Sequence, residues 1–520
     1  MAAVALALLL ATRLPFARPT CLPSDRRQAF GAAAAASGAA VREGGFAFWH
    51  PNPECVTERV DCGNANPTSP YAFVSLPSPY ADASQTAQHQ PQLPDWSLTS
   101  SEVVVVWQCA PSRSRYFGWT PYIHTRVRDG RRYTVFASLG DTASAGTQGP
   151  SSTHTAYSRV NSTAGPGALP FDHDAVLLMG ASPEAVAAVK TLLLKQGLPA
   201  AAVTVLPIPA RHYRQGDGST FSLYQRYALP EREELWQAWM RSPPVNVWSV
   251  TPQSPPARGW SQFTATQLIP KRGFSEMYLE EAAAALLESV RAHFAATPGA
   301  VVATHDDSRA SPLQSSAFCI EAYTNCGGDN RDTCYVAAQP QFMLPAAPQS
   351  LVVVVGANHQ ATGNGVYANL ALYDSKVRLG VTALSDDQFR GSAARWLFDS
   401  PFSSYADKLY AVALSRSCPP QLDMLCVTVP SQGFPSVPLE HFVSAVERPY
   451  AATDTTVGPD REMLLLPKLV LVNIAYASAP PTAAQDLTLH KQIQRAREGM
   501  RNMRTVIEDA AARVQRRVGR

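Results

Sequence analysis

The chain has 520 residues, of which 46% are hydrophobic and 9% are aromatic. This is enough apolar material for more than one packed core, so the composition excludes an intrinsically disordered protein. Charged residues make up only 16% of the chain and there are 43 prolines, a combination typical of strands and ordered loops. The formal net charge of +3 is small for this length, so electrostatics give no reason to expect a nucleic-acid partner, and we predict none.

The chain begins with MAAVALALLLAT, an apolar run that is too short to span a bilayer. It is similar to the apolar core of a secretory signal peptide, although the basic residue Arg13 follows the run instead of preceding it. We therefore predict a leader over residues 1–25 and a flexible, alanine-rich segment over 26–43. The alternative is an apolar amino-terminal strand. No later run is long and clean enough to predict a membrane span.

The nine cysteines predict a disulfide framework. Loss of a leader containing Cys21 would leave an even number, and close spacing then suggests three pairs, with the remaining two residues as a fourth: Cys55–Cys62, Cys326–Cys334, Cys418–Cys426 and Cys109–Cys319. These spacings do not match a zinc ribbon. Disulfides indicate an oxidising compartment, so we expect a secreted protein or one in the lumen of the secretory pathway. The sequon at Asn161 predicts a glycosylated asparagine.

In the first half of the chain, folded sequence is expected from about residue 44. The proline-rich stretch 67–99 predicts a long surface loop, and a buried run at 103–107, which begins with four valines, follows it. Strands are predicted at 116–126 and 133–139, joined by a tight turn at Asp129-Gly130. A strand–helix–strand unit comes next, in which Ser182 caps a helix that begins at Pro183 and ends at Gly197.

The second half repeats part of this pattern. A helix is predicted from Ser275 to about Ala296, and a second tetra-valine run lies at 352–355. Each valine run is followed by a polar loop and by two tyrosines six residues apart, Tyr116/Tyr122 and Tyr367/Tyr373. This pattern indicates either an internal duplication or ordinary buried antiparallel strands.

The predicted fold class is α+β, or α/β with mixed sheets. We expect two sheet-rich units, at 44–262 and 263–483, with a boundary where prolines cluster near 255–270. Residues 486–520 predict a basic amphipathic helix that docks on the body or on a partner.

Candidate site residues follow several apolar strands. Asp141, His305, Asp307 and His359 all stand at predicted strand ends, where loops converge over a rigid base. Brought together, they would form an acid/base site, or His305, Asp307 and His359 would bind a divalent metal such as zinc, manganese or iron. The alternative is that they serve turns in a non-catalytic extracellular binding or structural protein. The enzyme hypothesis thus predicts a hydrolase-type site, and the binding hypothesis does not.

The stretch SLGDTASAG at 138–146 resembles the first block of the SGNH (GDSL) hydrolases, in which a serine nucleophile follows Gly-Asp. The sequence GAN at 356–358 is similar to the oxyanion block of the same family. This chain departs from the pattern because Thr142 stands at the nucleophile position and His359 follows Asn358 where the family has an aspartate. The resemblance covers about a dozen residues and implies a hydrolase with Thr142 as its nucleophile.

Overall fold

The computed structural model describes residues 21–474, except 50–54, 56–61, 63–65, 78–94, 145–170, 214–217, 254–259, 265–267, 306–315, 348–349, 453–454 and 456. The predicted leader core, the sequon at Asn161 and the basic tail 486–520 lie outside these residues.

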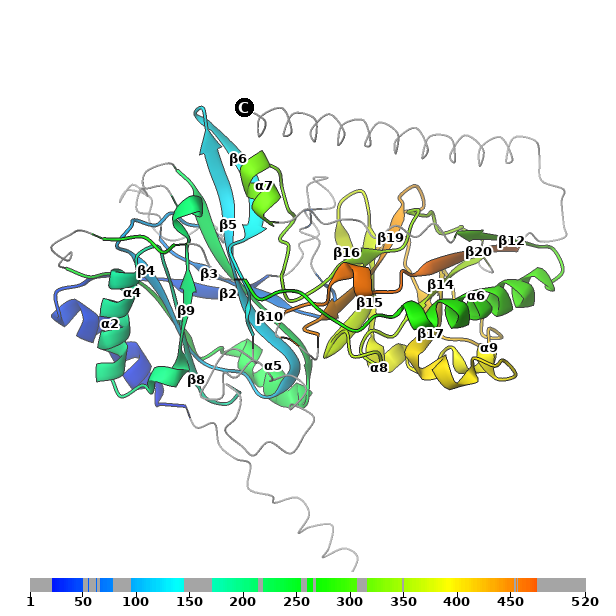
Figure 1. The fold of residues 1–520 in the computed structure, drawn as a ribbon, viewed down its shortest axis with the longest axis horizontal. Helices are drawn as coiled ribbons and strands as arrows, with labels where there is room; N and C mark the ends of the chain where they lie inside the picture. Colours follow the sequence, from blue (N-terminus) through cyan, green and yellow to red (C-terminus); the bar gives the residue numbers. More distant parts are fainter. Residues whose placement is uncertain are drawn as a thin grey trace, which may run out of the picture.

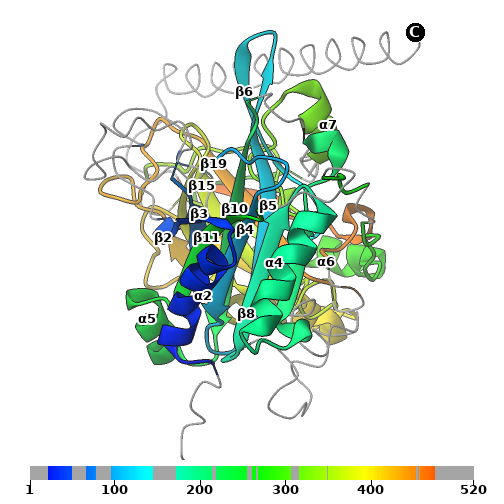
Figure 2. The same cartoon turned by 90° about the vertical axis from the view of Figure 1, so that its left-hand side faces the viewer.

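The first unit contains a helix-covered sheet with the strand order β1-β11-β4-β8-β9 (Figure 1). Its strands are β1 (Ala40–Glu43), β11 (Val245–Thr251), β4 (Val103–Cys109), β8 (Asp174–Gly180) and β9 (Val203–Pro207). The tetra-valine run forms the central strand β4, and its valines alternate between the two faces. Helices α2 (Ser24–Ala36) and α4 (Pro183–Lys195) pack side by side on one face (Figure 2). Ser182 caps α4 as predicted, since its hydroxyl accepts a hydrogen bond from the Ala185 N–H.

The other face of this sheet packs on an inner sheet with the order β2-β3-β10-β5-β6. Its strands are β2 (Gly45–Trp49), β3 (Tyr71–Ser75), β10 (Thr220–Pro230), β5 (Ser114–Arg128) and β6 (Arg131–Ser138), and the short β7 (Ala143–Ser144) pairs with β5. Val104 and Val106 of β4 and Trp119 of β5 are fully buried between the two sheets. Helix α5 (Glu233–Arg241) joins β10 to β11.

The second unit repeats this arrangement. Its helix-covered sheet has the order β12-β20-β14-β17-β18, with strands β12 (Ala300–His305), β20 (Lys468–Ile474), β14 (Leu351–Ala357), β17 (Leu409–Ser415) and β18 (Cys426–Thr428). Its inner sheet has the order β13-β19-β15-β16, with strands β13 (Val336–Ala337), β19 (Val443–Tyr450), β15 (Tyr367–Asp374) and β16 (Leu379–Ser385). The second tetra-valine run forms the central strand β14.

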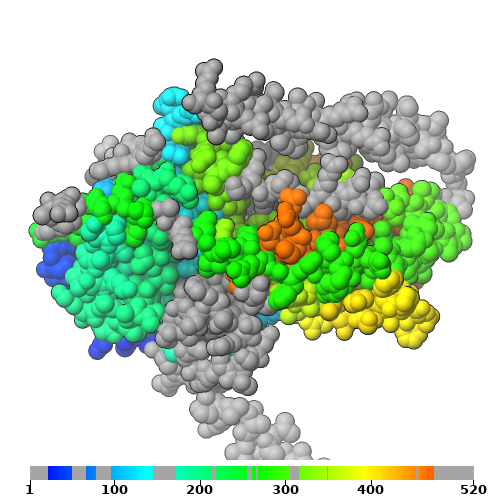
Figure 3. Space-filling view, in the orientation of Figure 1, coloured from blue at the N-terminus to red at the C-terminus, as the bar shows by residue number. Residues whose placement is uncertain are grey.

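Four short or medium helices complete this part of the chain: α6 (Glu280–Ala295), α7 (Ser316–Ala322), α8 (Asp386–Phe389) and α9 (Ala394–Leu397). Helix α6 packs on the helix-covered sheet of the second unit, and its Leu286 and Val290 are buried in the contact. It lies beside α9, where Phe294 meets Trp396, and Figure 3 shows the two segments adjoining in green and yellow.

Strand order is therefore the same in the two units. β11, β4, β8 and β9 correspond to β20, β14, β17 and β18, and the last pair is parallel in both units. In the inner sheets, β3, β10, β5 and β6 correspond to β13, β19, β15 and β16. The predicted mixed α+β fold with two sheet-rich units is confirmed, and the shared topology agrees with an internal duplication. The exact boundary between residues 262 and 263 stays a prediction.

Two local expectations were wrong. The segment 26–43, predicted to be flexible, contains most of α2 and all of β1, because Phe30 and Ala34 pack against the helix-covered sheet. The stretch 67–99, predicted to be a loop, contains β3, whose Ala72 and Val74 are buried. The alanine and proline content suggested loops, but tertiary packing stabilises a helix and a strand in the first segment and a strand in the second.

Four disulfides brace the described residues. Cys55–Cys62 and Cys418–Cys426 form as predicted. The predicted pairs Cys326–Cys334 and Cys109–Cys319 are corrected, because Cys326 bonds to Cys319, Cys109 bonds to Cys21, and Cys334 is a buried thiol. Cys326 has a cysteine at similar spacing on either side, so spacing alone could not select its partner. Cys21, assigned to the leader, is bonded into the first unit.

Within the described residues, no helix is both long enough and apolar enough to cross a membrane.

Candidate binding site between the two inner sheets

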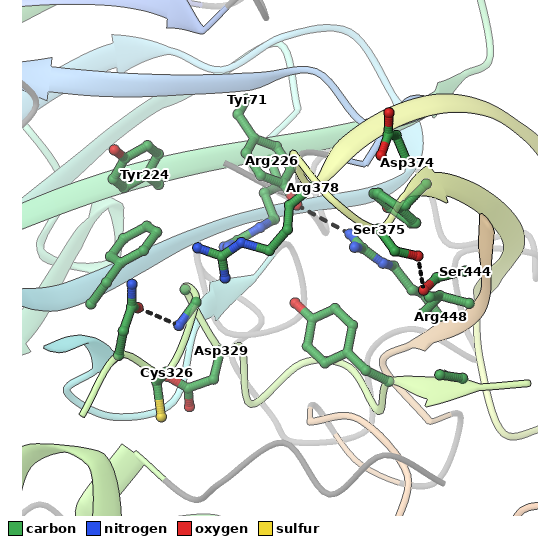
Figure 4. A pocket seen from close by; sticks show the side chains of 18 of the residues that line it. Tyr71, Tyr224, Arg226, Cys326, Asp329, Asp374, Ser375, Arg378, Ser444 and Arg448 are labelled. Carbon is green, nitrogen blue, oxygen red and sulfur yellow. Dashed lines mark hydrogen bonds between the residues drawn. The ribbon is translucent and has the colours of Figure 1, made fainter. Parts of the chain in front are cut away.

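A cavity of about 330 Å³ lies between the inner sheets of the two units. Its walls come from β3 and β10 of the first unit, from β15 and β19 of the second, and from the loop 325–329 between them (Figure 4). Arg226 and Arg448 are each only 2% exposed, whereas Asn325 and Gln341 at the edge are exposed. The pocket thus opens to solvent over a floor that carries two guanidinium groups.

Strand alternation places Arg226 in the pocket. Leu223, Gln225 and Tyr227 of β10 point to the core of the first unit, so Tyr224 and Arg226 point to the opposite face, toward the second unit. Arg226 donates from Nη1 to the Thr120 hydroxyl at 2.9 Å and from Nη2 to the Tyr122 hydroxyl at 2.5 Å. Its guanidinium also lies 4.8 Å from the centre of the Tyr71 ring. Within the described part of the chain, its Nε has no hydrogen-bond partner and no carboxylate forms an ion pair with it.

Arg448 reaches the pocket in the same way from β19. Ala445 and Glu447 point into the core of the second unit, so Val446 and Arg448 point out of it. The guanidinium of Arg448 lies 4.9 Å from the centres of both the Tyr335 and Tyr373 rings. Its Nη1 is 3.5 Å from the Tyr71 hydroxyl, the contact drawn in Figure 4. Tyr71 is therefore in contact with both arginines.

Strand registers show that these residues occupy equivalent positions. Arg226 lies opposite Tyr71 in β3 and opposite Gly118 in β5. Arg448 lies opposite Asn369 in β15, and Glu447 pairs with Val336, which puts Tyr335 beside Arg448. Tyr122 and Tyr373 are each four residues further along their strands than Gly118 and Asn369. Each unit therefore supplies one arginine and two tyrosines: Arg226, Tyr71 and Tyr122 from the first, and Arg448, Tyr335 and Tyr373 from the second.

Burial would lower the pKa of both arginines, but the surrounding tyrosines more than offset this, so the pKa of each guanidinium stays above its ordinary value. Burial would raise the pKa of Tyr71, yet Arg226 and Arg448 together hold that pKa below its ordinary value. Tyr122 and Tyr373, in contrast, have raised pKa values because burial dominates. The floor of the pocket is positively charged.

The carboxylates that line the pocket are engaged elsewhere. Asp374 lies 2.6 Å from Nδ1 of His441 and accepts the Lys376 N–H. Asp329 accepts hydrogen bonds from the N–H and the hydroxyl of Ser138, each at 2.8 Å. Burial raises the pKa of Asp329, which disfavours its charged form. A third arginine, Arg378, lines the pocket near Arg226 in Figure 4. An anionic guest therefore meets more positive than negative charge.

His359, predicted as a catalytic or metal-binding residue, lies outside this pocket in a buried cluster. Its Nδ1 is 2.9 Å from Glu276 and its Nε2 is 3.1 Å from Glu447, and Tyr410 donates to the same Glu447. Burial would lower the pKa of His359, but Glu276 and then Glu447 raise it to about 10. The raised pKa favours the charged form of His359, which links Glu276, just before α6, to Glu447 of β19 inside the second unit.

The other predicted site residues have different partners. Asp141 pairs with Arg331 and accepts the Ile269 N–H at 2.7 Å. His305 is the last residue of β12, but its side chain lies outside the described part of the chain, and so does the whole of Asp307. Among the described residues, no group of three or more His, Cys, Asp or Glu side chains has the arrangement of a metal site. The joint acid/base or metal site of these four residues therefore stays a prediction.

The residues of the hydrolase-like blocks also make structural contacts. Thr142 donates to the side-chain oxygen of Asn330 at 2.8 Å and lies 2.9 Å from the Thr120 hydroxyl. Asn358 donates to the Asp386 carbonyl and accepts the Ala361 N–H. None of these contacts involves a histidine, the residue that activates the nucleophile in Ser–His sites.

Sequence reasoning missed Arg226 and Arg448. A usable signal was present, because YQRY at 224–227 and VERPY at 446–450 each carry an arginine inside an otherwise half-apolar strand. Charged residues are almost never fully buried unless a partner compensates them.

The chain has low similarity to the known proteins with which it was compared. No family model and no curated protein matches the chain. An uncharacterized protein from Burkholderia cenocepacia superposes with a TM-score of 0.36 and 12% identity, covering 82% of this chain and 81% of its own. The VPA0106 protein from Vibrio parahaemolyticus superposes with a TM-score of 0.33 and 12% identity, covering 79% of this chain and 90% of its own.

Proposed function

We propose that this disulfide-stabilised protein is a binding protein for a small anion, which it holds in the pocket between its two inner sheets. The observation that carries the proposal is Arg226, a fully buried cation whose hydrogen-bond partners, Thr120 and Tyr122, are both neutral. Burying a charge without an opposite charge is costly, so such a group is usually compensated by a ligand or an ion pair.

Arg448 strengthens the proposal because it enters the same pocket from the other unit. Guanidinium groups present several N–H donors in a fixed plane and suit carboxylate, sulfate or phosphate oxygens. Two of them on one floor, with the Tyr71 hydroxyl between them, provide a preformed cradle of donors. This is the binding hypothesis of the sequence analysis, with a different set of residues from the strand-end positions.

We also infer a secreted or lumenal location. Four disulfides in one chain are typical of an oxidising compartment and uncommon in a reducing one.

Isothermal titration calorimetry of the full chain with inorganic phosphate and with phenyl phosphate measures the affinity of the proposed site. Hydrogen bonds to charged groups contribute about 1.5–3 kcal/mol, so Arg226→Gln and Arg448→Gln should each weaken binding by roughly tenfold to a hundredfold. Arg291→Gln is the matched control, since Arg291 is exposed on α6 and pairs with Glu288. Its affinity should equal that of the wild type.

Failure of both anions to bind, or unchanged binding by both pocket variants, would refute the proposal. Circular dichroism of each variant shows whether the substituted chain is folded. Arg226→Lys, which keeps the charge but loses the planar fork, should bind more weakly than wild type and more tightly than Arg226→Gln.

A further inference from the structure

The two ends of the pocket differ although its arginines and tyrosines are matched. On the first-unit side, Tyr224 packs between Tyr122 and Phe136, with ring centroids 5.8 Å and 5.5 Å away. At the equivalent positions of the second unit, Val446 replaces Tyr224 and Ala337 replaces Phe73, as the registers Tyr224↔Phe73 and Ala337↔Val446 show. Tyrosines line both ends, with Tyr335 and Tyr373 on the second-unit side, but the additional aromatic rings lie at the first-unit end only.

The opposite end is polar. The hydroxyls of Ser375 and Ser444 lie 2.8 Å apart, and Gln341 donates to Ser444 at 2.9 Å. These groups hydrogen-bond one another and offer no flat apolar surface. A planar apolar group would therefore be oriented toward the first unit.

Phe136 is held in the pocket wall by an unusual backbone. Between the pairs Ile123↔Ala137 and Thr125↔Thr134, β5 advances by two residues and β6 by three, so β6 carries a bulge opposite β5. Phe136 has φ +28°, a left-handed value that costs a bulky residue free energy. Here Val135 stays in the core of the first unit while Phe136 lines the pocket.

The loop 326–328 fixes this bulge. The N–H groups of Cys326 and Gly328 donate to the carbonyls of Val135 and Phe136, each at 2.9 Å, and the Cys319–Cys326 disulfide anchors the loop. Trp49 at the end of β2 completes the wall and, like Phe136, remains partly exposed. The wall thus consists of rings that are fixed in place and accessible from the pocket.

From this asymmetry we infer that the ligand is an organic anion with a planar aromatic body, whose acid group binds Arg226 and Arg448 and whose ring packs on Trp49, Phe136 and Tyr224. The inference rests on the proposed anion site and adds the chemical class of its ligand. Flat rings gain from edge-to-face and offset contacts with aromatic side chains beyond the burial of their area. A small inorganic anion would leave this wall in contact with water.

Titration of the full chain with three phosphate probes tests the inference: phenyl phosphate, glycerol 3-phosphate and inorganic phosphate. Phenyl phosphate should bind at least tenfold more tightly than the other two, given the transfer and stacking gain of one ring. Tyr224→Val, which copies the residue of the second unit, should reduce that preference to less than threefold. Arg291→Gln, the exposed control on α6, should leave the preference unchanged.

The outcomes separate the two proposals. Equal affinity for the three phosphates would overturn the aromatic ligand class and leave the anion site standing. No binding of any of them would overturn both. If Tyr224→Val unfolds the chain, Trp49→Leu at the partly exposed edge of the same wall provides the second variant, and unchanged preference there overturns the inference.

Discussion

Replacing His359 by glutamine should strongly destabilise the second unit, because it removes a buried positive charge that two carboxylates face. His359 is 1% exposed, Glu276 is fully buried and Glu447 is 2% exposed. Their ring and carboxylate atoms lie 2.9 Å and 3.1 Å apart. Loss of one partner of a buried ion pair costs about 3–5 kcal/mol, because the remaining charges are left uncompensated.

The measurement is thermal or urea unfolding of the full chain at pH 7. A loss of this size should lower the midpoint temperature by roughly 10 °C, at about 2–4 °C per kcal/mol for a unit of this length. His293→Gln is the control, since His293 is exposed on α6, and surface substitutions usually change stability by less than about 0.5 kcal/mol.

A triple variant with glutamine at positions 276, 359 and 447 separates charge from packing. It carries no buried charge in the cluster, so it should be more stable than His359→Gln alone. The reasoning is refuted if His359→Gln loses less than about 1 kcal/mol, or if the triple variant is less stable than the single one.

Three further predictions concern pH, disulfides and the pocket loop. In the folded chain the pKa of His359 is about 10, above the ordinary 6.5. The charged imidazole should therefore stabilise the fold fully below pH 6.5, and this stabilisation should be lost as the pH rises through 10. Over this interval the free energy of unfolding of the wild type should fall more than that of His359→Gln. Peptide mapping without reduction should link Cys21 to Cys109 and leave Cys334 as a thiol, and a Cys326–Cys334 peptide would contradict it. Breaking Cys21–Cys109, whose ends have a sequence separation of 88, should cost about 4–5 kcal/mol, against about 2–3 kcal/mol for Cys418–Cys426. Gly328→Ala should destabilise the fold more than Gly327→Ala and should weaken phenyl phosphate binding. Both glycines have positive φ, but only a Cβ added at Gly328 meets the Phe136 ring, at 2.6 Å. Equal effects of the two changes would argue against the rigid wall.

Local sequence patterns predicted the elements whose stability is local. Ser182 and Pro183 mark the start of α4 because capping depends on neighbours in the chain. The valine runs became central strands because residues buried on both faces need no alternation. Composition failed at 26–43, since an alanine-rich segment can be a linker or a helix, and only contact with Trp248 and the adjoining sheet decides between them.

The two strand arginines could have been singled out from the sequence, but their meeting in one site could not be predicted, because the site is assembled from distant strands. Nothing near Arg226 in the sequence shows that Tyr71 and Arg448 will lie beside it. His359 was a reasonable candidate from its place after a buried strand, but its partners Glu276 and Glu447 come from other parts of the chain. Their carboxylates raise the pKa of His359 and favour its charged form, so the imidazole stabilises the fold instead of serving as a base.

The division of the arginines between the two units means that neither half of the chain holds the complete proposed anion site on its own. Arg226 belongs to β10 and Arg448 to β19, and Tyr71 of the first unit reaches the guanidinium of the second. Any cut or truncation that frees one half would leave each fragment with a single cation on an exposed sheet face. Binding in the pocket would therefore require both units of the folded chain, and a bound ligand would stabilise their association.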